Sequence, residues 1–357
     1  MLIHELKLGG LLSFGPETPP LKMERLNVLV GPNGSGKSNF IEALGLLRSA
    51  ATKLAAPMRS PGGGGVTEWI WKGDPRAVAS IDAVINNPDS RQPLRHHIAF
   101  CAQAQHFELV DERIENAEPY PGHPDVYFFY RFQHGRPVLS IRDSDQKRQL
   151  QRQDIALDES ILSQRRDPDQ YPEMARLADS YEKSRLFREW SFGRTSVFRA
   201  PQAADLRNDI LEENFSNLGL FLNHLRSVPK VKNAIISQLR NLYEGLDDFD
   251  VRIKGGTVEV FLTEGDFVIP ASRLSDGTLR FLCLLAMLLC LVLFIKDLVL
   301  IPKVEFIPMQ KDIQQSLTEI ILTPKVAAQL LQVFILMQKE ILQEQEAKDP
   351  IQRDIIL

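Results

Sequence analysis

Cysteine is scarce in this sequence, with only Cys101, Cys283 and Cys290 in 357 residues. Their spacing fits no metal-ligand pattern, and two of them lie in apolar stretches where cysteine behaves as a small hydrophobic residue. This pattern argues against a cysteine metal site and favours a reduced, intracellular setting.

An excess of positive charge is also missing, because the formal net charge is -4. The sequence therefore gives no general electrostatic argument for nucleic-acid binding, and any DNA contact would need a local basic patch. Hydrophobic residues make up 44% and charged residues 25%, which are ordinary values for a folded soluble chain. The length predicts roughly two domains.

A secretion signal and a membrane span are not expected. Residues Met1–Lys7 contain no basic region followed by an apolar core. The apolar run Phe281–Ile295 is shorter than the ~20 residues that cross a bilayer. Lys296 and Asp297 stand where the run would have to be extended. We expect a cytoplasmic protein that makes no membrane contact.

The most specific motif is Gly31–Ser38, which fits the phosphate-binding pattern G-x-x-x-x-G-K-[ST]. Its glycines let successive backbone N–H groups point into one anion site. Lys37 is expected to reach the β- and γ-phosphates of a nucleoside triphosphate, and Ser38 to offer its hydroxyl to Mg²⁺. The expected binding residues are Gly31, Pro32, Asn33, Gly34, Ser35, Gly36, Lys37, Ser38 and Asn39.

The flanks of this motif have the required pattern. Leu26–Val30 reads as a short central strand. An apolar stripe at helical spacing follows, formed by Phe40, Ile41, Leu44 and Leu47. That helix would direct its positive N-terminal end at the phosphates.

The periodicity then becomes that of strands, after a Pro/Gly-rich connection at Pro57–Gly65. The strand-like runs are Ile81–Ile85, His97–Phe100, Phe107–Asp111, Tyr127–Phe132 and Val138–Arg142, and they indicate an antiparallel sheet. The aromatic run Tyr127–Phe132 has two interpretations. It is a half-buried strand, which we favour because aromatics pack well in strands, or a stacking platform for bases.

The rest of the chain completes a five-part division. The charged segment Asp143–Glu189 and the runs Leu211–Arg226 and Pro229–Leu242 predict helices, and strand patterns return from Val251 to Ile269 around a Gly255-Gly256 turn. The expected parts are 1–56 and 246–301, which form a split core, 57–142 as an antiparallel β sub-domain, 143–245 as a helical insertion, and 302–357 as a helical tail.

A second motif, Leu274–Thr278, opens an apolar helix. Ser275 followed by Asp276 and Gly277 is an ordinary helix N-cap on one interpretation. On the other, its hydroxyl and N–H groups form a second anion site. The motif alone does not decide between them.

Together these pieces resemble the ABC-type ATPases of the RecF/SMC group, in particular bacterial "AAA family ATPase" proteins with a split ATPase domain. Gly31–Asn39 looks like their Walker A motif, Leu274–Thr278 like their ABC signature, and Ile161–Arg165 like their glutamine loop. The resemblance implies an α/β fold, with a P-loop NTPase core of ABC type, an antiparallel β sub-domain and a helical insertion.

The resemblance also implies ATP and Mg²⁺ as cofactors, with Lys37, Gln164 and Ser275 in catalytic roles. Gln164 would join Ser38 near the metal, and Ser275 and Gly277 would close over the γ-phosphate held by the partner of a head-to-tail homodimer. DNA is a possible partner by family analogy, and a protein partner is unspecified.

The sequence departs from the family after about Leu289. No acidic pair follows the signature helix, where Asp297 stands alone after Lys296, and the last histidine is His224, so no switch histidine follows. The parallel strands that normally complete the core sheet are expected to be missing. A helical stripe from Val326 to Ile341 looks unrelated to the family. Either the reading frame is disrupted, or this is a divergent member that hydrolyses ATP poorly.

The sequence is compatible with four candidate functions. The leading one is an ATP-gated dimeric ATPase in DNA maintenance or anti-phage defence, and the second is a nucleotide-binding interaction module that does not hydrolyse ATP. A transporter ATPase subunit is disfavoured by Asn39 and the antiparallel inserts. A small-molecule phosphotransferase is weakest, because it leaves Leu274–Thr278 without a role.

Overall fold

The computed structural model describes residues 3–24, 27–87, 90, 92–133, 136–140, 147–149, 156, 158–188, 191, 193–294 and 305–308. The chain divides into two compact units. Unit 1 contains Met1–Leu186 and Ile301–Ser316, and unit 2 contains Phe187–Leu300 and Leu317–Leu357. The five-part division expected from the sequence remains a prediction.

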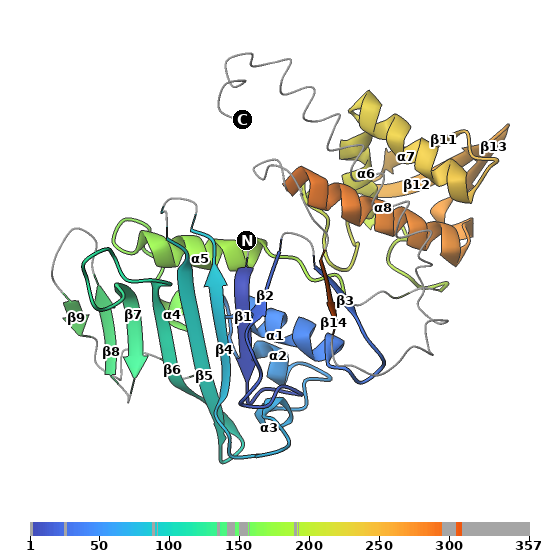
Figure 1. Ribbon diagram of the computed structural model, residues 1–357. Coiled ribbons are helices and arrows are strands. Elements are labelled where there is room, and N and C mark those ends of the chain that lie inside the picture. The colour runs from blue at the N-terminus through green and yellow to red at the C-terminus, as the bar shows by residue number, and fades with distance from the viewer. Residues whose placement is uncertain are drawn as a thin grey trace. The chain divides into compact units, whose positions relative to one another are not determined.

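Unit 1 is built on an eight-stranded sheet in which all neighbouring strands are antiparallel (Figure 1). In spatial order its strands are β2 (Leu21–Lys22), β1 (Ile3–Gly9), β4 (Ala79–Ile85), β5 (Leu94–Gln103), β6 (His106–Asn116), β7 (Phe128–Gln133), β8 (Arg136–Ser140) and β9 (Lys147–Gln149). The predicted antiparallel sheet is therefore present. Residues 134–135, between β7 and β8, lie outside the described residues.

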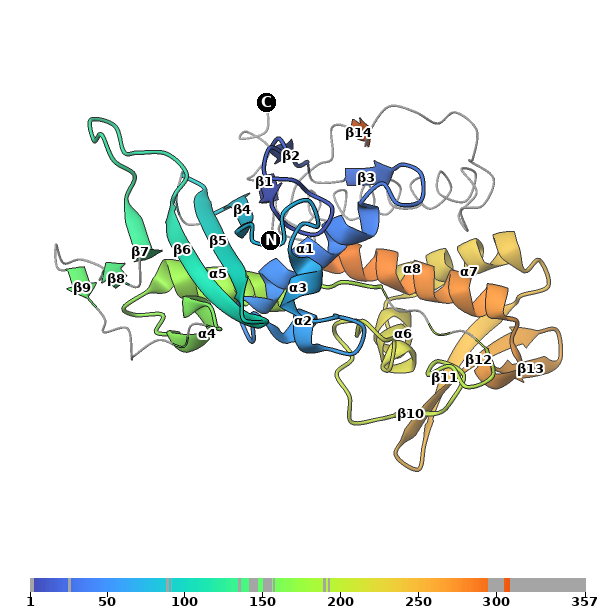
Figure 2. The same cartoon turned by 90° about the horizontal axis from the view of Figure 1, so that it is seen from below.

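Helices cover one face of this sheet, as Figures 1 and 2 show. They are α1 (Lys37–Ser49), α2 (Ala56–Arg59), α3 (Val66–Trp69), α4 (Ile161–Gln164) and α5 (Pro172–Lys183). Alternate residues of β4, such as Ile81 and Ala83, are buried toward them. In α1 the buried stripe runs through Phe40, Leu46 and Leu47, so Phe40 and Leu47 of the predicted stripe lie in the core.

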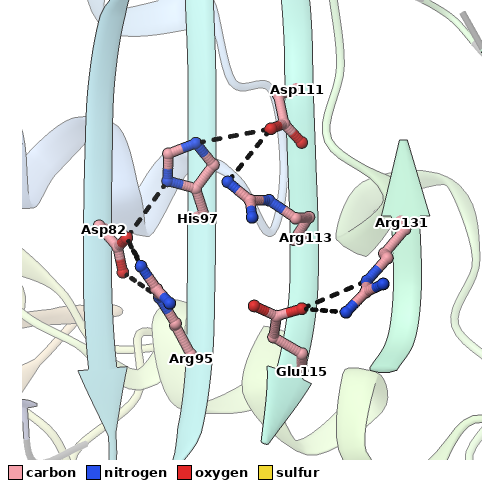
Figure 3. Close-up of polar contacts among 7 residues, drawn as sticks. All are labelled: Asp82, Arg95, His97, Asp111, Arg113, Glu115 and Arg131. Carbon is pink, nitrogen blue, oxygen red and sulfur yellow. Dashed lines mark hydrogen bonds and ion pairs between the residues drawn. The ribbon is translucent and has the colours of Figure 1, made fainter. Parts of the chain in front are cut away.

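The opposite face of the sheet carries charged side chains of both signs (Figure 3). Acidic and basic side chains alternate on this face from β4 to β7 and form ion pairs with one another. The residues are Asp82, Arg95, His97, Asp111, Arg113, Glu115 and Arg131. Side chains alternate between the two faces of a strand, so these strands present apolar residues to the helices and charges to the other side.

A separate pair of strands in unit 1 leads into the first motif. β3 (Asn27–Val30) pairs in parallel with β14 (Glu305–Pro308), and Glu305 lies opposite Asn27 while Pro308 lies opposite Val30. The sequence predicts that the parallel strands completing the core sheet are missing, and this prediction is wrong for the one parallel strand at 305–308. Residues 305–308 are too few to show a hydrophobic periodicity that would predict a strand, and it is the pairing with β3 that makes them one.

Unit 2 combines a small antiparallel sheet with three longer helices. Its elements are β10 (Gln202–Ala203), α6 (Leu218–Arg226), α7 (Pro229–Leu242), β11 (Asp248–Lys254), β12 (Thr257–Glu264), β13 (Phe267–Pro270), the 3₁₀ turn η2 (Ala271–Arg273) and α8 (Asp276–Phe294). β12 is central, pairing with β10, β11 and β13. The predicted Gly255-Gly256 turn joins β11 to β12, and both glycines have positive φ, as a two-residue hairpin loop requires.

The core of unit 2 lies between these strands and helices. It includes Cys283, whose burial raises the pKa of its thiol to about 12, as expected for a cysteine acting as a small hydrophobic residue. No helix within the described ranges is long and apolar enough to span a membrane.

Two local predictions differ from the structure. The helix predicted from Leu211 begins only at Leu218, because the Asn217 side chain holds the preceding segment as a loop, bonding to Glu212 N and to the carbonyls of Arg207 and Ile210. The expected helical insertion also contains two strands, β9 and β10, whose partners lie elsewhere in the chain. The predicted tail helix lies outside the described residues.

Candidate functional site

The first motif follows β3 and opens α1, as the sequence predicts. Asn27, the first residue of β3, holds Glu24 close to the strand: its Oδ1 accepts from Glu24 N at 3.0 Å and its Nδ2 donates to Glu24 O at 2.7 Å. β3 then ends at Val30, and the loop 31–36 leads directly into α1 at Lys37. We call Gly31–Ser38 the phosphate loop.

Two glycines give this loop its shape. Gly34 has φ of 81° and Gly36 has φ of 91°, a left-handed conformation that other residues rarely adopt. A Cβ on Gly36 would lie only 2.9 Å from Ser13 Oγ. Gly36 also begins the helix, because its carbonyl accepts from Phe40 N at 2.8 Å.

Lys37 folds back over the loop that precedes it. Its Nζ donates to Gly31 O at 2.6 Å, to Pro32 O at 2.7 Å and to Ser35 Oγ at 3.3 Å. The first turn of α1 contains no acidic residue, so the helix end and the lysine both present positive charge. Ser38 is exposed beside them. These residues fit a triphosphate with its metal: the loop can surround phosphate oxygens, and the Ser38 hydroxyl can serve Mg²⁺.

The structure does not bring Gln164 to this loop. Gln164 ends α4, which lies behind β6 and β7 in Figure 1, apart from the loop between β3 and α1 in both views. Its amide bonds to its own loop: Oε1 accepts from Ala156 N at 2.9 Å, and Nε2 donates to Ala156 O at 3.2 Å and Glu159 O at 3.1 Å. A metal-binding role for Gln164 stays a prediction, and it requires release of these bonds.

A buried polar cluster anchors α4 to the sheet, and sequence reasoning missed it. Glu112 on β6 accepts from Ile161 N at 2.9 Å and from the Ser160 hydroxyl, and Ser160 also caps α4 by accepting from Leu162 N at 3.1 Å. His96 Nε2 lies 3.3 Å from Glu112 Oε1, and His96 Nδ1 lies 2.8 Å from Tyr181 Oη on α5. These side chains come from distant parts of the chain, so no local pattern marks them.

The second motif is an exposed turn in unit 2. Ser275 caps α8, since its Oγ accepts from Thr278 N at 3.1 Å and lies 2.8 Å from Thr278 Oγ1. The N-cap interpretation is therefore confirmed, while the anion-site interpretation stays a prediction. Ser275, Asp276 and Gly277 are all exposed. A Cβ added to Gly277 would meet only Ser275 Oγ, at 3.7 Å.

Arg199 holds this turn in place. Its guanidinium donates to Leu274 O at 2.6 Å and Ser272 O at 3.3 Å, and it pairs with Asp276 Oδ1 at 2.5 Å. The hydrogen bond from Arg199 lowers the pKa of Asp276, and Gly193 N also donates to that carboxylate. Arg199 was not a sequence prediction, because a lone arginine 76 residues before Ser275 carries no motif.

Asp297, the one acidic residue near the expected Walker B position, lies outside the described residues. The described neighbour of β3 carries one carboxylate, Glu305, which lies opposite Asn27 at the end of β3 away from the phosphate loop. The other end of β14 carries Ile307 and Pro308. The described residues of β3 and β14 therefore contain no pair of adjacent acidic residues.

Most of the chain matches one known protein family. A family described as "AAA domain, putative AbiEii toxin, Type IV TA system" matches residues 26–295, a range that includes β3, the phosphate loop and the Ser275 turn. No curated protein matches the chain.

Among solved structures, one similar chain is an SmcHead bound to the C-winged helix domain of ScpA, with 15% identity, a TM-score of 0.41, and coverage of 80% of this chain and 75% of that one. Another is an Smc head domain with an extended coiled coil, bound to the C-terminal domain of ScpA derived from Pyrococcus furiosus. It has 15% identity, a TM-score of 0.40, and coverage of 80% and 77%. Because the family match spans well over half of the residues, this chain belongs to the AAA_21 family of AAA-type ATPase domains.

Proposed function

We propose that this protein is an ATP-binding member of the RecF/SMC-like class of ABC ATPases, in which ATP closes a homodimer. The observation that carries the proposal is the phosphate loop: Gly34 and Gly36 in left-handed conformation, and the Lys37 ammonium held over the loop at the start of a 13-residue helix. A helix N-terminus with a lysine and no carboxylate in its first turn favours a polyphosphate.

The Ser275 turn supports the dimeric part of the proposal. Ser275 and Gly277 are exposed, and glycine in a helix costs about 0.5–1 kcal/mol relative to alanine. Packing inside the described part of unit 2 does not require glycine at position 277, because a Cβ there would make only an ordinary van der Waals contact. Glycine would be required if a phosphate bound by a partner protomer came close to this backbone. A role in DNA maintenance or anti-phage defence completes the proposal, and the family description, with its toxin–antitoxin system, is compatible with a defence role.

A second candidate is a nucleotide-binding module that does not hydrolyse ATP. The observation that favours it is the register of β14 with β3, which puts Glu305 at the end away from the phosphate loop. Ligands of parallel sheets bind at the carboxyl ends of the strands, and the register puts position 305 at the opposite end of this pair, away from where Mg²⁺ and the attacking water are expected.

ATP turnover by the purified protein with Mg²⁺ separates the two. The Lys37→Ala variant serves as the blank, and Lys53→Ala, which removes an exposed lysine outside the loop, serves as the matched control. Turnover that Lys37→Ala abolishes and Lys53→Ala retains supports the ATPase. Tight Mg·ATP binding without turnover supports the second candidate. If Lys37→Ala binds ATP as tightly as the parent, the phosphate-loop assignment is wrong and both candidates fail.

A further inference from the structure

A pocket lies in unit 1, and the phosphate loop is not part of it. It has a volume of about 220 Å³ and is lined by residues from the segment after β4, from the end of β6 and the segment that follows it, from β7 and the end of β8, and from the start of α5. In Figures 1 and 2, β7 and β8 lie at one end of the unit and β3 at the other. No residue of the phosphate loop lines this pocket.

Aromatic rings form one wall of the pocket. Tyr120 and Tyr127 have ring centroids 6.3 Å apart, and Tyr127 meets Phe129 edge to face at 5.1 Å. Tyr120 is 43% exposed and Tyr127 is 40% exposed, so both residues of the lining are accessible to a ligand. Stacking on exposed aromatic rings is a favourable contact that proteins use for flat ligands.

A bulge in β7 creates this wall. Ile114 pairs with Tyr130 while Glu115 pairs with Phe128, so β7 has one extra residue, Phe129. The bulge redirects Phe129 into the pocket lining. Beyond it, Tyr127 stays next to β6, because its carbonyl accepts from Asn116 N at 2.9 Å. Bulges often redirect a side chain beside a functional site.

Amide side chains face the same space. Asn87 and Asn116 are 5% and 1% exposed, and Gln170 lies two residues before α5. Within the described residues, no acceptor receives a hydrogen bond from Asn116 Nδ2, although this atom is buried. A buried donor without an acceptor is costly, so this amide is a strained part of the wall behind the rings.

We propose that this pocket binds a nucleobase. The rings would stack on its faces, and the exposed amide of Gln170 would bond to the oxygen and nitrogen atoms of its edge, as amide side chains do when they read bases. The pocket is smaller than the roughly 300–1,000 Å³ of sites for larger ligands, which suits a single ring system. Its described lining contains Glu173 but neither Lys nor Arg, so it recognises the base and not a phosphate.

A nucleobase can come from a free nucleoside or from an unstacked base of a single strand. The sequence leaves the aromatic run Tyr127–Phe132 as a half-buried strand or a stacking platform. The structure shows the strand, and stacking stays a prediction. Tyr130 and Phe132 point into the core, while Phe129 lines the pocket just after Tyr127. The proposal does not depend on ATP binding at Lys37.

The test measures two kinds of probe on the full chain carrying Lys37→Ala, so that the phosphate loop does not contribute. Fluorescein-labelled ten-residue strands of dA, dT or dC are titrated by anisotropy, with the matching duplex alongside. Unphosphorylated adenosine, guanosine, cytidine and thymidine are titrated by calorimetry. Tyr120→Ala and Tyr127→Ala are the test variants, and Tyr127→Phe keeps the ring. Phe267→Ala is the control, because it removes a 73% exposed aromatic ring from unit 2.

We expect binding of at least one probe, with Kd raised about 5- to 150-fold by Tyr127→Ala, the range for losing one stacked base. Tyr127→Phe and Phe267→Ala should stay within about threefold of the parent. Nucleoside binding would identify a free-base site, and binding of single strands alone would identify a base from a polynucleotide. The proposal is overturned if neither probe binds, if both tyrosine variants bind like the parent, or if the duplex binds as well as the single strand.

Discussion

Asp82 shows how one carboxylate ties a sheet face together. Burial alone would raise its pKa, but the hydrogen bond from Arg95 at 2.8 Å and the His97 ring, whose Nδ1 lies 3.4 Å from Asp82 Oδ2, outweigh burial and hold the pKa of Asp82 well below its ordinary value. The side chain is only 14% exposed, so the pair is less screened than a surface ion pair, although Arg95 is 40% exposed.

We therefore expect Asp82→Asn to lower the free energy of unfolding by about 1–2 kcal/mol near pH 7. A depressed carboxyl pKa stabilises the fold above the unfolded-state pKa of about 4 and loses that contribution as pH falls below it. Urea unfolding of the parent and the variant from pH 7 to pH 3 checks this. A stability difference that stays constant, or grows, on acidification would contradict the assignment.

Ser160 belongs to the buried cluster that holds α4. Ser160→Ala removes the cap on Leu162 N and one of the hydrogen bonds to Glu112, and we expect a loss of about 1–3 kcal/mol of unfolding free energy. Ser60→Ala is the matched control, since that hydroxyl is exposed and only bonds Pro57 O within its own turn. Equal effects of the two substitutions in urea unfolding would show that the cluster adds nothing.

At the scale of the element, the start of α8 depends on Arg199 as well as on its own cap. The Arg199 side chain is 12% exposed, and its guanidinium donates hydrogen bonds to the carbonyls of Ala271 and Leu274. It therefore holds the geometry of the exposed residues Ser275 and Gly277, which the proposed dimer would use.

We expect Arg199→Gln to lower the free energy of unfolding by about 1–3 kcal/mol and to weaken ATP-promoted dimerisation. Arg207→Gln is the control, because the Arg207–Asp209 pair is exposed on both sides and should contribute less than about 1 kcal/mol. Urea unfolding and light scattering with Mg·ATP give the two readouts. If the arginine variants behave alike in both, Arg199 does not organise the turn.

At the scale of the whole molecule, the family match runs through both units, from residue 26 to residue 295. The phosphate loop belongs to unit 1 and the Ser275 turn to unit 2. A head-to-tail dimer would pair each loop with the turn of the other protomer, which makes complementation between two damaged protomers the decisive test.

We expect Lys37→Ala and Ser275→Arg each to abolish turnover alone, since each removes one half of both composite sites. A heterodimer of the two variants keeps one intact site, so an equal, randomly assorted mixture should recover up to about a quarter of the parent's turnover. Turnover of the mixture is measured against each variant at the same total concentration. A mixture as inactive as each variant alone would contradict composite sites. If the parent does not turn over ATP, the amount of dimer formed with Mg·ATP is measured instead of turnover.

Local patterns determined much of this protein. The phosphate loop, the strand before it and the helix after it follow from glycine conformational freedom and short-range periodicity, and the Gly255-Gly256 hairpin and the Ser275 cap follow from turn and cap chemistry. Each of these depends on residues within about one turn of helix or one hairpin, which is the range over which sequence alone is informative.

Tertiary structure decided the rest. Strand β14 exists because β3 offers it a partner almost 280 residues earlier in the chain. The Glu112 cluster, the Arg199 bonds and the pocket between Tyr127 and Asn116 also join side chains that only folding brings together. Contacts of this kind leave no period or spacing in the sequence, because their partners are set by packing and pairing between distant elements.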